Sequence, residues 1–228
     1  MKRSQITKII LIIMLLSLTA CNNSFVPEII EPDSTPPINY QTSLQVKELS
    51  LIENFTERVS GDITHIVLHF ISNVVANREN PYIIEDIHQI LMTYDASVHY
   101  IIDRDGTIYR SVPEYLSARH AGPGNLEDFP QYENYLNQNS IGIEILAIGT
   151  QEEMAQFLTS AEYRSLNPSL IGFTDKQYAA VNKLINDILN RHQAIKPNRR
   201  HIIGHDEYAP GKTDPGSLFD WYRLDFMK

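Results

Sequence analysis

Apolar and polar side chains alternate in the stretch 63–70 (ITHIVLHF), and this pattern predicts a β-strand. The stretch is rich in β-branched residues, and successive side chains of a strand point to opposite faces. His65 and His69 therefore share one face with Val67, while Ile66 and Leu68 share the other. Two histidines lie on one face of a strand whose opposite face is apolar.

Further short apolar runs predict the rest of a sheet. Residues 140–148 (SIGIEILAI) are apolar on both faces, which is typical of a central strand covered on both sides. Residues 97–102 and 107–112 flank the sequence DRDG, and Asp-Gly between two apolar runs is a strong hairpin signal. A short strand is predicted over 201–203.

Two segments place apolar residues at helical spacing, 83–94 and a stretch that begins at Thr174. Thr174 and Gln177 have the spacing of a capping box, and a proline follows the end of the helix at position 197. His192, near that end, is expected to face solvent. Strands and helices together predict the α/β class: a single domain with a central mixed β-sheet flanked by helices.

The first twenty residues have the pattern of a signal peptide rather than of a folded element. Lys2, Arg3 and Lys8 precede an apolar run, 9–18, that is too short to span a bilayer comfortably, since a span needs about 20 residues. Residues 18–21 (LTAC) then resemble a bacterial lipobox and end in Cys21. We therefore expect a lipoprotein signal peptide over 1–20, with Cys21 as the lipidated first residue. An ordinary secretory signal, with an incidental cysteine, is the alternative.

Residues 21–45 combine four prolines with polar side chains and show no sustained apolar period, which indicates a flexible tether. The expected domains are thus a leader (1–20), a lipidated tether (21–45) and a folded domain (46–228). The expected location is outside the cytoplasm, with the chain anchored to a membrane of the bacterial envelope through the lipid on Cys21.

Composition narrows the class of protein. With 228 residues, 43% hydrophobic and 21% charged, the chain has the make-up of an ordinary globular protein. Its single cysteine excludes a disulfide framework and any cysteine-rich zinc cluster. The net charge is −9, and −12 once the three basic residues of the leader are removed, so nucleic acid is not an expected partner. We expect a monomer.

Several polar residues stand where a domain without chemistry would not place them. His69 ends a buried strand, Glu144 lies inside the most apolar strand, and the loop 204–216 (GHDEYAPGKTDPG) holds a histidine, a lysine and several acids. Two histidines and one carboxylate at strand ends suit a catalytic zinc ion. On residue types alone, ordinary packed histidines remain an alternative, and periodicity does not choose between His65 and His69.

Five stretches, ITHIVLHF, SVHYIIDRDGTIY, ARHAG, SIGIEI and GHDEYAPGKTDPGSLFDW, occur in an order that resembles the zinc-dependent N-acetylmuramoyl-L-alanine amidase family. The fold of this family is shared with phage amidase-type lysozymes and animal peptidoglycan recognition proteins. The resemblance covers roughly residues 60–225. It implies hydrolysis of the amide between the lactyl group of N-acetylmuramic acid and L-alanine, in peptidoglycan or muropeptides.

The resemblance also assigns roles to residues. It implies that His69, His205 and Asp214 hold one Zn²⁺ ion, that Glu144 is the general base and acid acting on a zinc-bound water, and that Lys212 stabilises the oxyanion. Burial in an apolar strand is expected to raise the pKa of Glu144, as a base acting near neutral pH requires.

Two residues are expected to contact substrate, His120 and Arg119 of the ARHAG stretch. Arg119 stands where the family often has an aromatic residue, and Gly211 joins Lys212 directly where the family often has an arginine between them. The alternatives are a muropeptide-binding module of the same fold that does not cut, and a zinc peptidase that cuts within the stem peptide.

Overall fold

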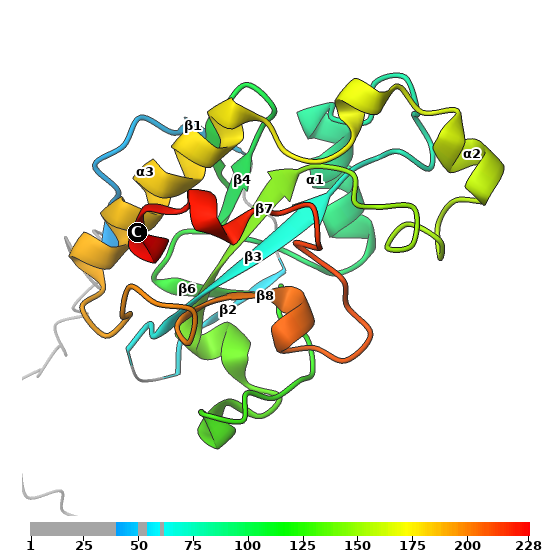
Figure 1. The fold of residues 1–228 in the computed structure, drawn as a ribbon. Helices are drawn as coiled ribbons and strands as arrows, with labels where there is room; N and C mark the ends of the chain where they lie inside the picture. Colours follow the sequence, from blue (N-terminus) through cyan, green and yellow to red (C-terminus); the bar gives the residue numbers. More distant parts are fainter. Residues whose placement is uncertain (1–39, 50–53, 60–61) are drawn as a thin grey trace, which may run out of the picture. The chain divides into compact units, whose positions relative to one another are not determined.

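The computed structural model describes residues 40–49, 54–59 and 62–228 (Figure 1). The expected leader, Cys21 and most of the expected tether lie outside the described residues. The strands are β1 (Lys47–Glu48), β2 (Phe55–Glu57), β3 (His65–Ile71), β4 (Tyr100–Ile102), β5 (Ile108–Arg110), β6 (Leu116–Ala118), β7 (Ser140–Leu146) and β8 (Ile202–Gly204). The helices are α1 (Ile84–Thr93), α2 (Ser160–Arg164) and α3 (Asp175–Arg191), with short 3₁₀ turns that include Leu136–Asn139 and His205–Glu207.

Six strands form one sheet in the order β1-β5-β4-β7-β3-β8. The neighbours β4, β7, β3 and β8 run parallel, while β5 pairs with β4 in the antiparallel sense. The predicted mixed sheet and α/β class are therefore confirmed. Strands β2 and β6 pair separately as a two-stranded antiparallel ribbon.

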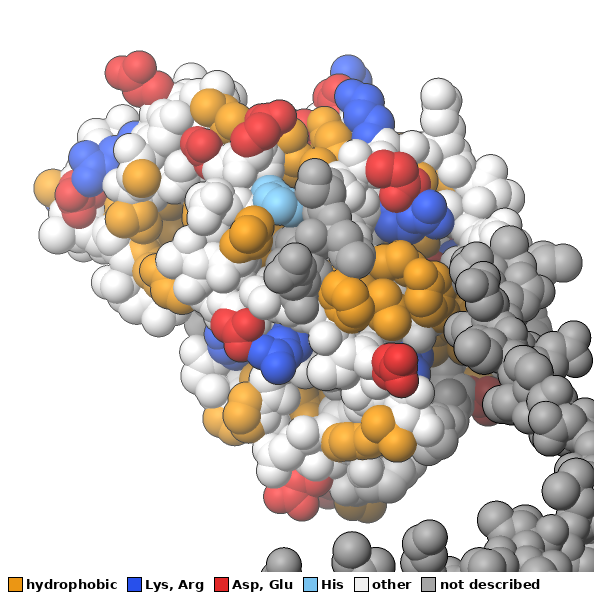
Figure 2. All heavy atoms as spheres, turned by 180° about the vertical axis from the view of Figure 1, so that it is seen from behind, with side chains coloured by type: hydrophobic (Ala, Val, Ile, Leu, Met, Phe, Trp, Pro, Cys, Tyr) orange, Lys and Arg blue, Asp and Glu red, His pale blue; other side chains and the backbone are white. Residues whose placement is uncertain are grey.

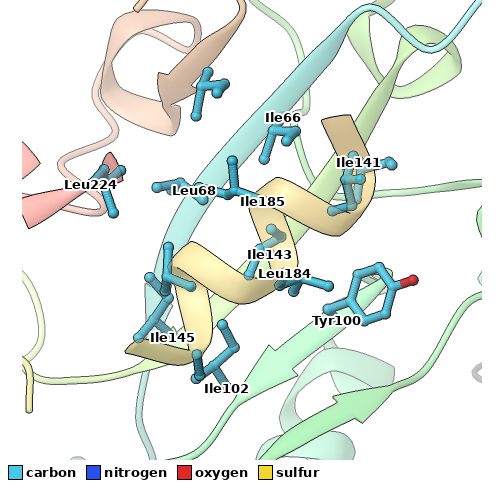
Figure 3. Close-up of a cluster of buried hydrophobic side chains, with 14 of the residues drawn as sticks. Ile66, Leu68, Tyr100, Ile102, Ile141, Ile143, Ile145, Leu184, Ile185 and Leu224 are labelled. Atoms are coloured by element: carbon cyan, nitrogen blue, oxygen red, sulfur yellow. The ribbon is translucent and has the colours of Figure 1, made fainter. Parts of the chain in front are cut away.

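The alternation predicted for β3 separates two faces of the sheet. Ile66 and Leu68 point to the side covered by α3, where Figure 3 shows them in one apolar cluster with Ile143 of β7 and with Leu184 and Ile185 of α3. Burial of such side chains contributes about 1.5–3 kcal/mol each. The other face of β3 and β7 carries the polar side chains of the candidate site. Strand β3 thus contributes one face to the hydrophobic core and the other face to the candidate site.

The two local signals read from the sequence form as predicted. The Thr174 hydroxyl accepts a hydrogen bond from the Gln177 amide, and the Gln177 side chain accepts one from the Thr174 amide, which completes the capping box of α3. Strands β4 and β5 pair across the expected hairpin, with Gly106 at φ 84° in the turn. Strands β1, β2 and β6 and helix α2 were not predicted, since each has only two to five residues and no turn or apolar run in the sequence marks it.

Residues 40–45, which fall within the expected tether, contact the folded part of the chain. The hydroxyls of Thr42 and Ser43 each donate to a different carboxylate oxygen of Asp187 on α3, both at 2.7 Å. The ring of Tyr40 packs on His192, with centroids 5.6 Å apart. For residues 21–39, which lie outside the described residues, the tether remains a prediction.

The surface carries charges of both signs. Seen from behind the view of Figure 1, acidic and basic side chains are interspersed, with hydrophobic side chains gathered between them (Figure 2). Within the described ranges, no helix combines the length and the apolar character needed to cross a bilayer.

Candidate active site

Three adjacent parallel strands bring the reactive residues to one edge of the sheet. His69 near the end of β3 pairs in register with Glu144 of β7, and Leu68 pairs with Gly204, the last residue of β8, so that His205 follows directly. Ligands bind outside the carboxyl ends of strands in open α/β sheets. Topology thus joins residues that are far apart in the sequence.

Asp214 completes a cluster with the two histidines. Its Oδ2 atom lies 2.8 Å from Nδ1 of His69 and 3.0 Å from Nδ1 of His205. The Asp206 amide donates to the Asp214 carbonyl at 2.9 Å and holds this loop against the end of β8. His69, His205 and Asp214 are the only described residues that form a group of at least three with ligand atoms close enough to share a metal ion.

The hydrogen bonds of His205 test whether this cluster suits a cation. Nε2 of His205 lies 3.0 Å from the carbonyl oxygen of Ala121. A carbonyl only accepts, so Nε2 carries a proton, and the neutral form of this ring has the lone pair of Nδ1 on the side of Asp214. A cation bound between that lone pair and the carboxylate would stabilise both. Two imidazole nitrogens and one carboxylate oxygen fit a zinc ion that keeps a fourth position open.

One histidine of the cluster is held neutral. Burial lowers the pKa of His69, which favours the neutral imidazole that a metal ligand requires.

Glu144 is a buried carboxyl group without a full set of partners. It is 8% exposed, and its Oε2 atom has no hydrogen-bond partner among the described residues. Burial raises the pKa of Glu144 well above its ordinary value, the charge of Asp214 adds to this, and Lys212 opposes it. An exposed lysine and a buried acid thus line the same cleft.

The two residues expected to contact substrate also line this cleft. His120 is buried, and its ring lies between Nε2 of His69 and the hydroxyl of Ser140, at 3.1 Å from each. Arg119 forms an ion pair with Asp95 at the cleft. Substrate contact by either residue stays a prediction.

The other histidine that shares the face of β3 lies apart from the cluster. His65 is fully buried and packs against Phe129, Tyr132 and His201, with its ring 5.2 Å from that of His201. Burial lowers the pKa of His65 to about 4, so the ring is neutral. The structure therefore separates two histidines that the alternation of the strand could not distinguish.

The cleft has a volume of about 920 Å³, and the three residues of the cluster are among those that line it. Its lining also includes apolar side chains, among them Val75, Ile90, Tyr94, Met154 and Phe157. Sequence analysis missed these apolar residues, since they come from one helix and two irregular segments. It also missed Ser140, although Ser140 shares a strand face with Glu144 and could have been found from that alternation.

Comparison with known proteins agrees with this arrangement. The chain is 34% identical over 129 residues to the 1,6-anhydro-N-acetylmuramyl-L-alanine amidase AmpD of Citrobacter freundii, which is 56% of this chain and 54% of that protein. AmpD of Enterobacter cloacae is 31% identical over 149 residues, or 65% of this chain and 63% of that protein. The chain thus spans a little more than half the length of the curated relatives that it matches.

Solved structures share the fold. A selenomethionine derivative of AmpD superposes with a TM-score of 0.57 at 26% identity, over 78% of this chain and 92% of that one. AmiD of E. coli, in complex with the substrate anhydro-N-acetylmuramic acid-L-Ala-D-γ-Glu-L-Lys, gives a TM-score of 0.52 at 27% identity, over 71% and 56%. Residues 59–217, which contain every residue of the cluster and of the cleft described above, match the N-acetylmuramoyl-L-alanine amidase family, and the chain belongs to that family.

Proposed function

We propose that this chain is a zinc-dependent amidase that hydrolyses the bond between the lactyl group of N-acetylmuramic acid and L-alanine of the stem peptide. The observation that carries the proposal is that Glu144, buried and with one carboxylate oxygen unpartnered among the described residues, lines one cleft together with the cluster of His69, His205 and Asp214. A buried acid beside a cation site is the arrangement that metal-assisted hydrolysis requires.

His69, His205 and Asp214 would hold one zinc ion. When bound, zinc polarises a scissile carbonyl and lowers the pKa of a water molecule to about 7. Asp214 contributes the negative charge of the ligand set, and both histidines contribute neutral nitrogens, so the set leaves a net positive charge for the substrate carbonyl.

Glu144 moves the proton in this proposal. Its raised pKa suits a carboxylate that takes a proton from the attacking water and then gives it to the leaving amine of L-alanine. Lys212, exposed at the same cleft, donates to the oxygen on which negative charge develops. One well-placed donor of this kind contributes about 3–4 kcal/mol to transition-state stabilisation.

The substrate class follows from the relatives and the shape of the cleft. AmiD binds an anhydromuropeptide, and AmpD is named for the same anhydro sugar. A cleft of about 920 Å³, lined by both apolar and polar side chains, has room for a sugar and the first stem residues. We therefore propose peptidoglycan or its released muropeptides as the substrate.

The deciding experiment is digestion of purified muropeptides by the zinc-loaded protein, with the products identified by mass. Free stem peptide that begins with L-alanine, together with the intact sugar, supports the proposal. Products cut within the stem would point to a peptidase, and binding without products would point to a recognition module. A strong chelator should abolish hydrolysis and added zinc should restore it, whereas full activity of metal-free protein would remove zinc from the proposal.

We further propose that the chain is an extracytoplasmic lipoprotein anchored through Cys21. The support is the sequence pattern of residues 1–21, since these residues lie outside the described ranges. Cys21→Ala should move the protein from the membrane fraction to the soluble fraction. Unchanged membrane association of that variant would contradict the proposed anchor.

A further inference from the structure

We propose that His120 is a positioning residue that holds His69 in its metal-binding form, through a chain of hydrogen bonds that ends at the main-chain carbonyl of Leu136. The inference rests on the proposed function because it concerns a ligand of the same metal ion. It adds a role for two residues, His120 and Ser140, that touch the cation site only through His69.

The direction of each hydrogen bond follows from the end of the chain. The Ser140 hydroxyl lies 2.7 Å from the Leu136 carbonyl oxygen, which only accepts, so Ser140 donates its single proton there. Its oxygen is then free to accept from Nε2 of His120 at 3.1 Å. With its proton on Nε2, the neutral ring of His120 offers the lone pair of Nδ1 to Nε2 of His69, also at 3.1 Å.

His69 must therefore carry its own proton on Nε2. Nδ1 of His69 is then left with a lone pair, directed at Asp214 from 2.8 Å, which is the geometry of a metal ligand. The competing tautomer has the proton on Nδ1 and donates it to Asp214, which blocks metal binding. The carboxylate of Asp214 alone would favour the second form, in which it accepts the Nδ1 proton. The hydrogen bond that Nε2 of His69 donates to His120 opposes this and favours the first form.

The backbone around His120 is fixed in the same way. The side-chain oxygen of Asn137 accepts from the amides of His120 and Ala121, at 3.1 and 2.8 Å. The Ala121 carbonyl in turn accepts from His205. One dipeptide thus fixes both imidazoles of the cluster, one through a side chain and one through the main chain. Gly142 leaves room for this ring, since a Cβ atom at that position would lie 2.4 Å from Cγ of His120.

Three variants and one control test the role. His120→Leu removes both hydrogen bonds, His120→Gln keeps one acceptor and one donor, and Ser140→Ala removes only the end of the chain. Ser111→Ala is the matched control, because Ser111 is also a buried serine and its hydroxyl has no partner among the described residues. For each protein, zinc affinity is measured by competition with a chromophoric chelator, and the proton on His69 is located by ¹⁵N NMR of the imidazoles.

We expect His120→Leu to weaken zinc binding by about 10- to 100-fold, the usual effect of losing a partner of a metal-binding histidine. Ser140→Ala should weaken it by about 2- to 10-fold, and His120→Gln should recover most of the loss. The NMR signal of His69 in the metal-free protein should show a larger share of the Nδ1-protonated form in His120→Leu, and Ser111→Ala should match wild type.

Wild-type zinc affinity in folded His120→Leu and Ser140→Ala would overturn this inference while leaving the amidase proposal intact. An unchanged His69 tautomer in His120→Leu would also overturn it, since a purely structural role predicts that result. If the wild-type protein itself binds no zinc, the proposed function fails. The zinc titration of wild type therefore tests the proposed function, and the comparison with the variants tests the role of His120.

Discussion

Glu114 and Glu144 are both buried, at 0% and 8% exposure, yet their surroundings differ in almost every respect. Glu114 accepts hydrogen bonds from Tyr100 at 2.6 Å, from Arg191 at 2.7 Å and from His192 at 2.6 Å. Both of its oxygens are satisfied, and a second nitrogen of Arg191 also contacts it. Glu144 has one oxygen without any partner among the described residues.

The two pKa values move in opposite directions for this reason. Burial alone would raise the pKa of Glu114, but hydrogen bonds from His192 and Arg191 outweigh burial and hold that pKa at about 2. At Glu144 burial dominates, so its pKa is raised. A buried carboxylate that is fully paired stabilises a fold, whereas one that is left unpaired is available to exchange a proton. The first locks α3 to the sheet, and the second faces the cleft.

Replacing Glu144 should have the largest effect of the changes considered, and this effect should be on turnover and not on zinc binding. Glu144→Gln removes the proton-exchanging group and keeps its shape, so turnover of a defined muropeptide should fall by about 10²–10⁴-fold. This equals a barrier increase of about 3–5 kcal/mol. Zinc content should be unchanged, because none of the three proposed ligands is altered. Turnover near that of wild type would exclude Glu144 from proton transfer and leave Lys212 or His120 to be tested.

Replacing the paired acid should affect stability instead. Glu114→Gln removes one of the two buried carboxylates that pair with Arg191, and breaking such a buried pair costs about 3 kcal/mol or more. Denaturant unfolding at neutral pH measures this loss. The folded fraction should keep the kcat of wild type, since Glu114 is not among the residues that line the cleft. A fall in kcat without a fall in stability would contradict the division of roles between the two acids.

The sequence revealed Glu144 and not the Glu114 cluster, and the reason is physical. Glu144 stands in an otherwise apolar strand, so its burial follows from the alternation of its neighbours. Glu114 lies in an irregular segment, and its partners Arg191 and His192 are 77 and 78 residues away. The spacing of apolar residues along the sequence gives no information about contacts between residues so far apart. The expectation that His192 faces solvent is wrong: it is 6% exposed, because it turns from the end of α3 toward Glu114.

The residues of the metal cluster were predictable from the sequence, but the hydrogen bonds around them were not. Strand ends and the family resemblance brought His69, His205 and Asp214 together, and the structure places them in one cluster. Alternation alone could not choose between His65 and His69, since the choice depends on which end of β3 faces the loop that carries Asp214. The chain from Leu136 through Ser140 to His120 was not predicted, because it depends on a 3₁₀ turn and two side-chain rotamers.

The pH dependence of stability should separate the same two acids with a smaller effect. A lowered folded-state pKa means that the contribution of Glu114 is present above the unfolded-state value near 4.5 and is lost as pH falls toward 2. A raised pKa means the reverse for Glu144, whose contribution is lost as pH rises. In metal-free protein, Glu144→Gln should therefore be more stable than wild type at about pH 8, and this gain should vanish below about pH 4. Parallel stability curves for wild type and Glu144→Gln would show that Glu144 is not shifted.

The smallest effect should come from the outer end of the Glu114 network. Arg191 contacts Glu114 and Asp187 together, and Asp187 accepts from the hydroxyls of Thr42 and Ser43. The network thus ties the residues before β1 to α3 without touching the cleft. Replacing both hydroxyls, in Thr42→Ala with Ser43→Ala, removes the two hydrogen bonds to Asp187 and the one that Thr42 accepts from the Leu44 amide, all partly exposed, and should cost about 1 kcal/mol.

In a domain of this size a loss of about 1 kcal/mol lowers Tm by about 2–4 °C, which calorimetry resolves. Asp187→Asn should cost more, since it also weakens the ion pair with Arg191, whose guanidinium is 2.9 Å from the Asp187 carboxylate. Both changes should leave muropeptide turnover at the wild-type value, because none of the residues of this network lines the cleft. Reduced turnover in the double variant, measured well below its Tm, would mean that residues 40–45 influence the cleft and that the two buried acids are coupled.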